Sequence, residues 1–203
     1  MTAKIRLRQH TNPLNYRGPY QGPAPHKLLG GPVSELEIGP GLGELLVARA
    51  RQDPDIRLLG VEVRRAYVEI CNESLDKANV RNARAIYSEV RTDLDLLVPD
   101  ASLHRVYFMF PDPWFKRKHF KRRVMTTEFA KKLTRKLRVG AELHWATDSG
   151  ILALDIRAHL AQVDNLVQVA EVPEAAWLSG RGMHHQRQGD LIFGGCYQRL
   201  PSW

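Results

Sequence analysis

Cysteine is scarce in this chain of 203 residues, which contains only Cys71 and Cys196. Two thiols so far apart in sequence provide neither a disulfide framework nor the ligand spacing of a zinc site, so a reducing compartment fits best. We expect both thiols to lie in the core, and we expect the protein to bind no metal.

Long apolar runs are also missing. No stretch approaches the roughly 20 apolar residues that a membrane-spanning helix needs, and the basic N-terminus, MTAKIRLRQH, lacks the apolar segment of a secretory signal. No basic segment has the strong apolar face of a helix that lies on a membrane surface. These absences predict a cytoplasmic protein that does not bind membranes.

Negative charge is in deficit. Lys and Arg number 30 against 22 Asp and Glu, which gives a formal charge of +8 and a pI near 9.7. An excess of positive charge favours a polyanionic partner, most simply nucleic acid. The length suits one α/β domain with a substantial core, preceded by a short extra arm.

Residues 1–30 are rich in proline, glycine and polar side chains. Because repeated prolines disfavour regular helices and strands, we predict an N-terminal arm at 1–30 and a single domain at 31–203. The arm is either a disordered leader or a segment that orders over RNA, with Arg6 and Arg8 as candidate phosphate contacts.

Strand-like apolar segments alternate with segments of helical periodicity through the rest of the chain. Strands are expected at 34–38, 57–61, 82–87, 104–109, 138–147, 166–172 and 191–199. Helices are expected at 44–51, 65–77, 90–98, 124–137 and 151–160, and a polar loop at 177–189. The alternation predicts a doubly wound α/β sheet, mostly parallel. The last strand is expected to be antiparallel because only a short connection precedes it.

A glycine cluster, Gly39, Gly41 and Gly43, lies between the first strand and the first helix, just after Glu37. Glycines in a strand-turn-helix context permit close approach of the backbone to a ligand, although they could simply form a turn. Glu62 follows about twenty residues later, at the end of the second strand, where such folds place an acid on ribose hydroxyls. A surface glutamate that caps the next helix is the alternative for Glu62.

Three further carboxylates, Glu89, Asp112 and Asp148, follow later strands. Two of them have an alternative role, since Glu89 could cap a helix and Asp148 could be the N-cap of the helix at 151–160. Acidic residues do not suit a polyphosphate ligand, and the GxxxxGK[ST] lysine is absent, which argues against an NTPase. A neutral or cationic nucleoside fits better, and S-adenosylmethionine has both ribose hydroxyls and a positive sulfonium.

The segment 110–123, FPDPWFKRKHFKRR, combines a proline-bracketed carboxylate with a run of basic residues. Pro111 and Pro113 restrict how Asp112 can point. The basic residues that follow suit a phosphate backbone, although a solvated loop is the simpler explanation of a charge run.

At these motifs the chain resembles the bacterial tRNA (guanine-N7-)-methyltransferases, over roughly residues 5–199. The similarity lies in LEIGPGLGE at 36–44, GVE at 60–62, the segment 110–123, ATD at 146–148 and RLRQHTNPL near the start. It implies a class I methyltransferase fold in which Glu37, Glu62 and Glu89 contact S-adenosylmethionine. It also implies that Asp112 is catalytic and that Lys116 and Asp148 contact the guanosine. The tRNA backbone would be met by Lys118, His119, Lys121, Arg122 and Arg123.

The chain departs from the family at two places. The position of Glu89 is usually Asp, and the C-terminal Thr-Lys-Phe-Glu motif has no counterpart. Its nearest alignment is Met183 to Gln186, so His184, Gln186 and Arg187 are the candidate substrate contacts, and Ser179 and Arg181 are alternatives.

The resemblance implies methyl transfer to N7 of a tRNA guanosine, in the variable loop. A SAM-fold RNA-binding protein with weak or no activity, or a methyltransferase acting on another RNA, is the alternative. Monomer and homodimer both remain open.

Overall fold

The computed structural model describes residues 11–201. The expected phosphate contacts Arg6 and Arg8 lie outside the described residues.

Seven strands form one sheet in the order β3-β2-β1-β4-β5-β7-β6. The strands are β1 (Glu35–Ile38), β2 (Leu58–Glu62), β3 (Ala83–Tyr87), β4 (Leu103–Met109), β5 (Leu137–Thr147), β6 (Leu166–Ala170) and β7 (Phe193–Arg199). The strands from β1 to β5 pair in parallel, and β7 runs antiparallel to both β5 and β6. The predicted doubly wound sheet with an antiparallel last strand is therefore confirmed.

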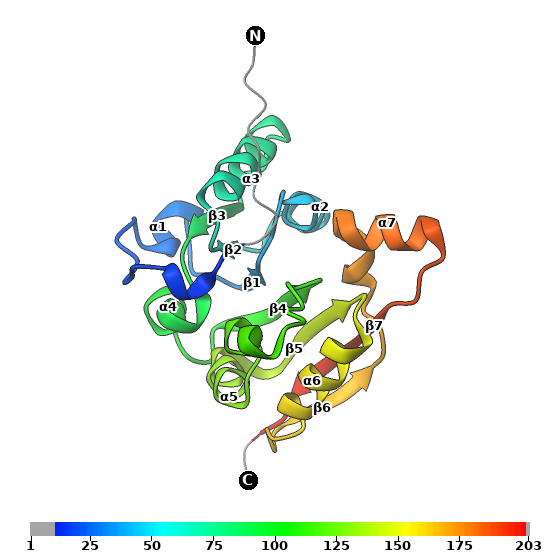
Figure 1. The fold of residues 1–203 in the computed structure, drawn as a ribbon. Coiled ribbons are helices and arrows are strands. Elements are labelled where there is room, and N and C mark those ends of the chain that lie inside the picture. Colours follow the sequence, from blue (N-terminus) through cyan, green and yellow to red (C-terminus); the bar gives the residue numbers. More distant parts are fainter. Residues whose placement is uncertain (1–10, 202–203) are drawn as a thin grey trace.

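Helices cover both faces of this sheet (Figure 1). They are α1 (Pro25–Leu29), α2 (Glu44–Gln52), α3 (Arg65–Lys77), α4 (Val90–Leu97), α5 (Thr127–Lys136), α6 (Gly150–Leu160) and α7 (Gly180–Gln188). Helices α2 and α3 lie on one face, and α4, α5 and α6 lie on the other (Figure 1). All the predicted strands and helices are present, with ends that differ from prediction by at most three residues.

Alternation along the central strands divides the core into two layers. Val106 and Phe108 of β4 belong to the apolar cluster under α4, α5 and α6. Tyr107 and Met109 belong to the cluster under α2 and α3. Cys71 and Cys196 are buried, as predicted.

The expected polar loop at 177–189 is wrong, because the chain there forms a short 3-10 helix, Glu174–Leu178, followed by α7. The Ser179 side chain caps α7 by accepting from the Gly182 N–H at 3.0 Å, and Gly189 ends it at φ 69°. Helix α7 buries Gly182 alone among its residues, so the sequence carries no apolar periodicity. Its two caps were the available signal.

The proline-rich start of the chain also contains more structure than expected. Pro25 occupies the first turn of α1, where a missing N–H costs nothing, and Leu29 enters the core at 4% exposure. The Tyr16 hydroxyl donates to Asp93 at 2.6 Å, and the Tyr20 N–H donates to the same carboxylate oxygen at 3.1 Å. The separation of an arm from the domain at residue 30 stays a prediction.

Candidate active site

Three carboxylates meet at the carboxyl edge of the sheet, where β1 and β4 separate. The strand order reverses between β1 and β4, because β2 and β3 follow on one side of β1 and β4 and β5 lie on its other side. A ligand crevice is expected at such a point in an open α/β sheet. A cavity of about 660 Å³ lies there, lined by Glu37 of β1, Asp112 after β4 and Asp148 after β5. Gly39 and Gly41 line it from one side, and Ser179, Gly180 and Arg181 line it from the other. The structure thus brings together residues that lie more than 140 positions apart.

A smaller cavity of about 110 Å³ adjoins the first. Its lining includes Glu62, Val63 and Trp114. Gly39, Arg64, Phe110 and Asp112 line both cavities. Asp112 therefore lies where the two spaces meet.

Glu37 is the most perturbed acid of the site. Its residue is 3% exposed, and within residues 11–201 its Oε2 has no hydrogen-bond partner. Burial, together with the charges of Glu44 and Glu62, raises the pKa of Glu37 to about 8. A buried carboxyl oxygen without a partner that faces a cavity is suited to a cationic donor from a ligand.

Glu62 is neither exposed nor a helix cap. Its carboxylate is 2% exposed and accepts from Arg64, with the guanidinium Nε at 2.9 Å and Nη2 at 3.0 Å. Burial alone would lower the pKa of Arg64, but the bonds to Glu62 and the charges of Glu62 and Asp112 raise it above the ordinary value. The sequence-based prediction did not include Arg64, although its position two residues after the strand-end acid was the available signal.

The glycine loop divides into two functions. Gly39 and Gly41 have φ of 73° and 57°, and a Cβ added at either would meet nothing within 4 Å. Gly43 has φ 88°, but a Cβ there would lie 2.5 Å from the Cys71 Sγ. Gly39 and Gly41 leave room for a ligand, whereas Gly43 lets α2 pack closely against α3.

The loop around Asp112 is held at both ends by residues of positive φ. Phe110 has φ 49° and Trp114 has φ 45°, values in a backbone region that residues other than glycine rarely adopt. The Trp114 ring contacts His119 edge to face at 5.8 Å, and the Arg122 guanidinium lies 4.9 Å from its centroid. These contacts and the two prolines fix the direction of Asp112.

Helix α7 reaches the site through Asp148. The Arg181 Nη2 donates to the Asp148 Oδ2 at 2.8 Å, and the His185 Nε2 lies 3.4 Å from the same oxygen. His185 Nδ1 bonds Asp190 at 2.8 Å. The capping alternative for Asp148 is wrong, because the Ser149 side chain caps α6 by accepting from the Leu152 N–H at 3.3 Å.

Several predicted contacts lie elsewhere. Glu89 caps α4 through the Thr92 N–H and pairs with Arg91, which is the capping alternative, and its contact with the cofactor stays a prediction. Of the residues described, neither cavity includes Glu89, Gly43, Lys116, His184, Gln186 or Arg187 in its lining. Lys116, His184, Gln186 and Arg187 are exposed. In the C-terminal segment, the alternatives Ser179 and Arg181 reach the cavity instead, because the first turn of α7 is the part that faces it.

The basic segment after Trp114 is not uniform. Lys118 and Lys121 are exposed, and His119 and Arg122 are half-buried. Arg123 is 5% exposed, donates to the Pro113 carbonyl at 3.0 Å and pairs with Asp155 at 3.1 Å. The guanidinium is thus held by contacts within the fold, and the expected contact of Arg123 with the RNA backbone stays a prediction.

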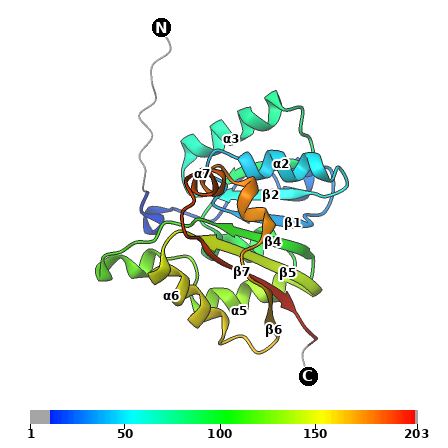
Figure 2. The same ribbon diagram turned by 90° about the vertical axis from the view of Figure 1, so that its right-hand side faces the viewer.

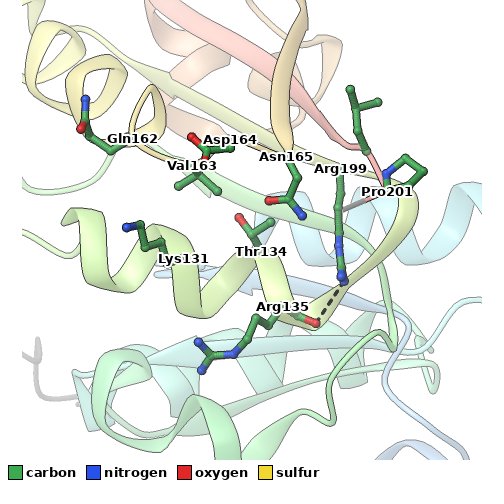
Figure 3. Close-up of a pocket in the computed structure, with 10 residues that line it drawn as sticks. Lys131, Thr134, Arg135, Gln162, Val163, Asp164, Asn165, Arg199 and Pro201 are labelled. Carbon is green, nitrogen blue, oxygen red and sulfur yellow. Dashed lines mark hydrogen bonds between the residues drawn. The ribbon is translucent and has the colours of Figure 1, made fainter. Parts of the chain in front are cut away.

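A third cavity, of about 550 Å³, lies at the opposite edge of the sheet. Figure 3 shows Lys131, Arg135 and Arg199 around it, with Arg199 donating to the Arg135 carbonyl at 3.3 Å. Arg135 precedes β5 and Arg199 ends the antiparallel β7. This cavity is therefore remote from the strand-end carboxylates.

The described residues contain neither a cluster of metal ligands nor a helix that could span a membrane. Within residues 11–201, no three or more His, Cys, Asp or Glu side chains gather as a metal site would require. No helix in the same part of the chain has the length and apolar content needed to cross a membrane.

Comparison of the sequence with known proteins gives one consistent family. A family model described as a putative methyltransferase matches residues 32–180. A tRNA (guanine-N(7)-)-methyltransferase of Synechococcus sp. (strain JA-2-3B'a(2-13)) is 35% identical over 164 residues, 77% of this chain and 67% of that protein. One of Shewanella amazonensis (strain ATCC BAA-1098 / SB2B) is 42% identical over 113 residues, 56% of this chain. That match spans 48% of the Shewanella protein, about half its length.

Solved structures agree with the sheet topology. A geranyl diphosphate C-methyltransferase from Streptomyces coelicolor A3(2) superposes with a TM-score of 0.57 at 14% identity, covering 86% of this chain and 77% of that one. An rRNA methylase from Streptococcus thermophilus gives 0.57 at 12% identity, covering 87% and 92%. The fold is that of the class I SAM-dependent methyltransferases. The predicted family is confirmed, and the chain belongs to the tRNA (guanine-N7-)-methyltransferases.

Proposed function

We propose that this chain transfers the methyl group of S-adenosylmethionine to N7 of a guanosine in the variable loop of tRNA. The observation that carries the proposal is the convergence of Glu37, Asp112 and Asp148 on one cavity. Methylation at N7 leaves a positive charge on the guanine ring, and carboxylates stabilise a charge of that sign as it develops.

The residues present fit the cofactor. Glu37 offers its buried, unpartnered Oε2 to the cofactor ammonium, and Gly39 and Gly41 leave space beside the backbone. Glu62 suits the ribose hydroxyls from the smaller cavity, with Arg64 holding its carboxylate. When bound, S-adenosylmethionine supplies a methyl group on a cationic sulfur.

Asp112 has the central role. Guanine N7 carries an in-plane lone pair, so no proton need leave before attack, and alignment matters more than a strong base. Asp112 accepts hydrogen bonds from the guanine N1–H and N2–H edge and offsets the growing ring charge. Asp148 shares this task. Phe115, which is 67% exposed where it lines the larger cavity, offers a stacking surface to an unstacked base.

The tRNA backbone is met by Lys118, His119, Lys121 and Arg122. Lys116, which follows the cavity-lining Phe115, contacts the guanosine. Lys118 and Lys121 are exposed and follow the Asp112 loop directly. Phosphate contacts of this kind make binding strongly dependent on salt. A cytoplasmic location fits a tRNA substrate.

The test is a methyl-transfer assay with purified protein, S-adenosylmethionine and unmodified bulk tRNA, with nucleosides resolved by mass. We expect 7-methylguanosine, and we expect Asp112→Ala to lower kcat about 100-fold with cofactor binding intact. Asp112→Asn, which keeps an acceptor but loses the charge, should also lose most of its turnover.

Absence of 7-methylguanosine, with cofactor binding intact, would favour the alternative of an RNA-binding protein or another RNA acceptor. Near-normal turnover in both Asp112 variants would contradict the role of Asp112 while leaving the reaction itself standing.

A further inference from the structure

Arg181 forms a hydrogen bond with Asp148, the carboxylate that contacts the guanine in the proposed function. Its Nη2 donates to the Asp148 Oδ2 at 2.8 Å, across the cavity mouth from Asp112. Both side chains keep access to solvent, since Arg181 is 47% exposed and Asp148 is 25% exposed. The contact joins the start of α7 to the end of β5, so it closes one side of the cavity.

The Arg181 guanidinium and the Watson–Crick edge of guanine present similar hydrogen-bond donors. A guanidinium presents N–H groups on a planar carbon that bears three nitrogens, and a carboxylate accepts from them. Guanine carries a neutral version of this arrangement, because its C2 is also a planar carbon bonded to three nitrogens and its N1–H and NH₂ groups are donors on the same edge. A carboxylate placed to accept from one is therefore placed to accept from the other.

We propose that Arg181 is an internal stand-in for the guanine edge, which holds Asp148 while the site has no RNA and leaves when the base enters. This inference rests on the proposed contact between Asp148 and guanosine. An adenine edge, which places an acceptor at N1, does not reproduce the two donors and cannot replace Arg181 on the carboxylate. The exchange thus favours guanine.

The energetics suit an exchange. An ion pair this exposed is weak, so a base can displace it at little cost. The His185 Nε2 lies 3.4 Å from the same oxygen and its Nδ1 bonds Asp190 at 2.8 Å, so the imidazole stays beside Asp148 when Arg181 leaves. In the molecules in which Arg181 is paired with Asp148, the guanine contact is blocked. The apparent affinity for tRNA is therefore lowered in proportion to the fraction of molecules that have this pair.

The test compares Arg181→Ala with Lys77→Ala. Lys77 forms an exposed pair with Glu73 on α3 at 3.5 Å, so its variant also removes one positive charge. Loss of a positive charge ordinarily weakens RNA binding. We expect the opposite sign for Arg181→Ala, with a KM and a dissociation constant for unmodified tRNA about two- to five-fold lower. Lys77→Ala should show no such gain.

The gain must also depend on Asp148. In an Asp148→Asn background, Arg181→Ala should give no further tightening, because the pair is already broken. A higher dissociation constant in Arg181→Ala, an unchanged one, or a gain that survives Asp148→Asn would overturn the inference.

The two proposals fail differently. If the wild-type protein forms no 7-methylguanosine, the proposed function is wrong, and the dissociation constants still decide the role of Arg181. If the wild-type protein forms it and Arg181→Ala binds no more tightly, the exchange alone is wrong.

Discussion

The imidazole ring of His185 stacks on the phenyl ring of Phe110, with centroids 5.7 Å apart and planes inclined by 26°. Phe110 begins the loop that carries Asp112, and His185 lies on α7, beside α2 in Figure 2. This contact couples the proposed catalytic loop to a C-terminal helix that lacks the motif of its family.

We expect His185→Ala to lower kcat/KM for tRNA by up to about tenfold, because the stack contributes about 0.5–1.5 kcal/mol and Asp148 loses a neighbour that orients it. His185→Phe keeps the stack and loses the imidazole, so its kcat/KM should be intermediate. The comparison is His184→Ala, since the adjacent side chain is exposed. A larger loss in His184→Ala would restore the sequence-based assignment.

Glu37 should make the cofactor-free protein less stable as the pH rises. Its folded-state pKa of about 8 exceeds the ordinary value of 4.5, so the folded state binds this proton more tightly than the unfolded state does. The resulting stability is fully present below pH 4.5 and is lost as the pH rises to about 8. Glu37→Gln removes this dependence, and its advantage in urea unfolding should be greater at pH 8.5 than at pH 5. A stability gain of Glu37→Gln that does not change with pH would contradict the raised pKa of Glu37. We also expect Glu37→Gln to bind the cofactor more weakly.

Gly43→Ala and Gly41→Ala should separate packing from ligand binding. Both place a side chain at positive φ, which costs about 1–2 kcal/mol. Gly43→Ala adds a clash with the Cys71 side chain, so its free energy of unfolding should fall by about 1–3 kcal/mol more. Gly41→Ala should affect cofactor affinity more than stability. Denaturant titration and calorimetric cofactor binding measure the two effects, and equal losses of stability would speak against the close packing.

Arg123 and Lys118 should respond oppositely to truncation, although the sequence groups them together. Arg123→Ala breaks a nearly buried pair with Asp155 and frees the Pro113 carbonyl, so we expect a loss of about 2–3 kcal/mol of stability. Lys118→Ala should leave the melting temperature unchanged and reduce the slope of log affinity against log salt by about one. A stable Arg123→Ala protein with a reduced salt slope would return Arg123 to the RNA surface.

The sequence predicted the sheet and the grouping of three strand-end acids because both depend on local signals. Apolar alternation sets the strands, and the turn glycines follow β1 directly. The carboxyl ends of parallel strands meet at one edge whatever the packing, so Glu37, Asp112 and Asp148 could be grouped in advance. Glu89 shows the limit, since a strand-end acid is also a helix cap, and only the position of Thr92 decides between them.

The family, the fold and the strand-end acids could all be predicted from the sequence, because they rest on periodicity, turn chemistry and motif spacing. The partners of Arg64, Arg123, Arg181 and His185 came only from the three-dimensional structure. Each is a long side chain whose role depends on which carboxylate or ring lies within its reach. For Arg123, Arg181 and His185 that partner comes from a distant part of the chain.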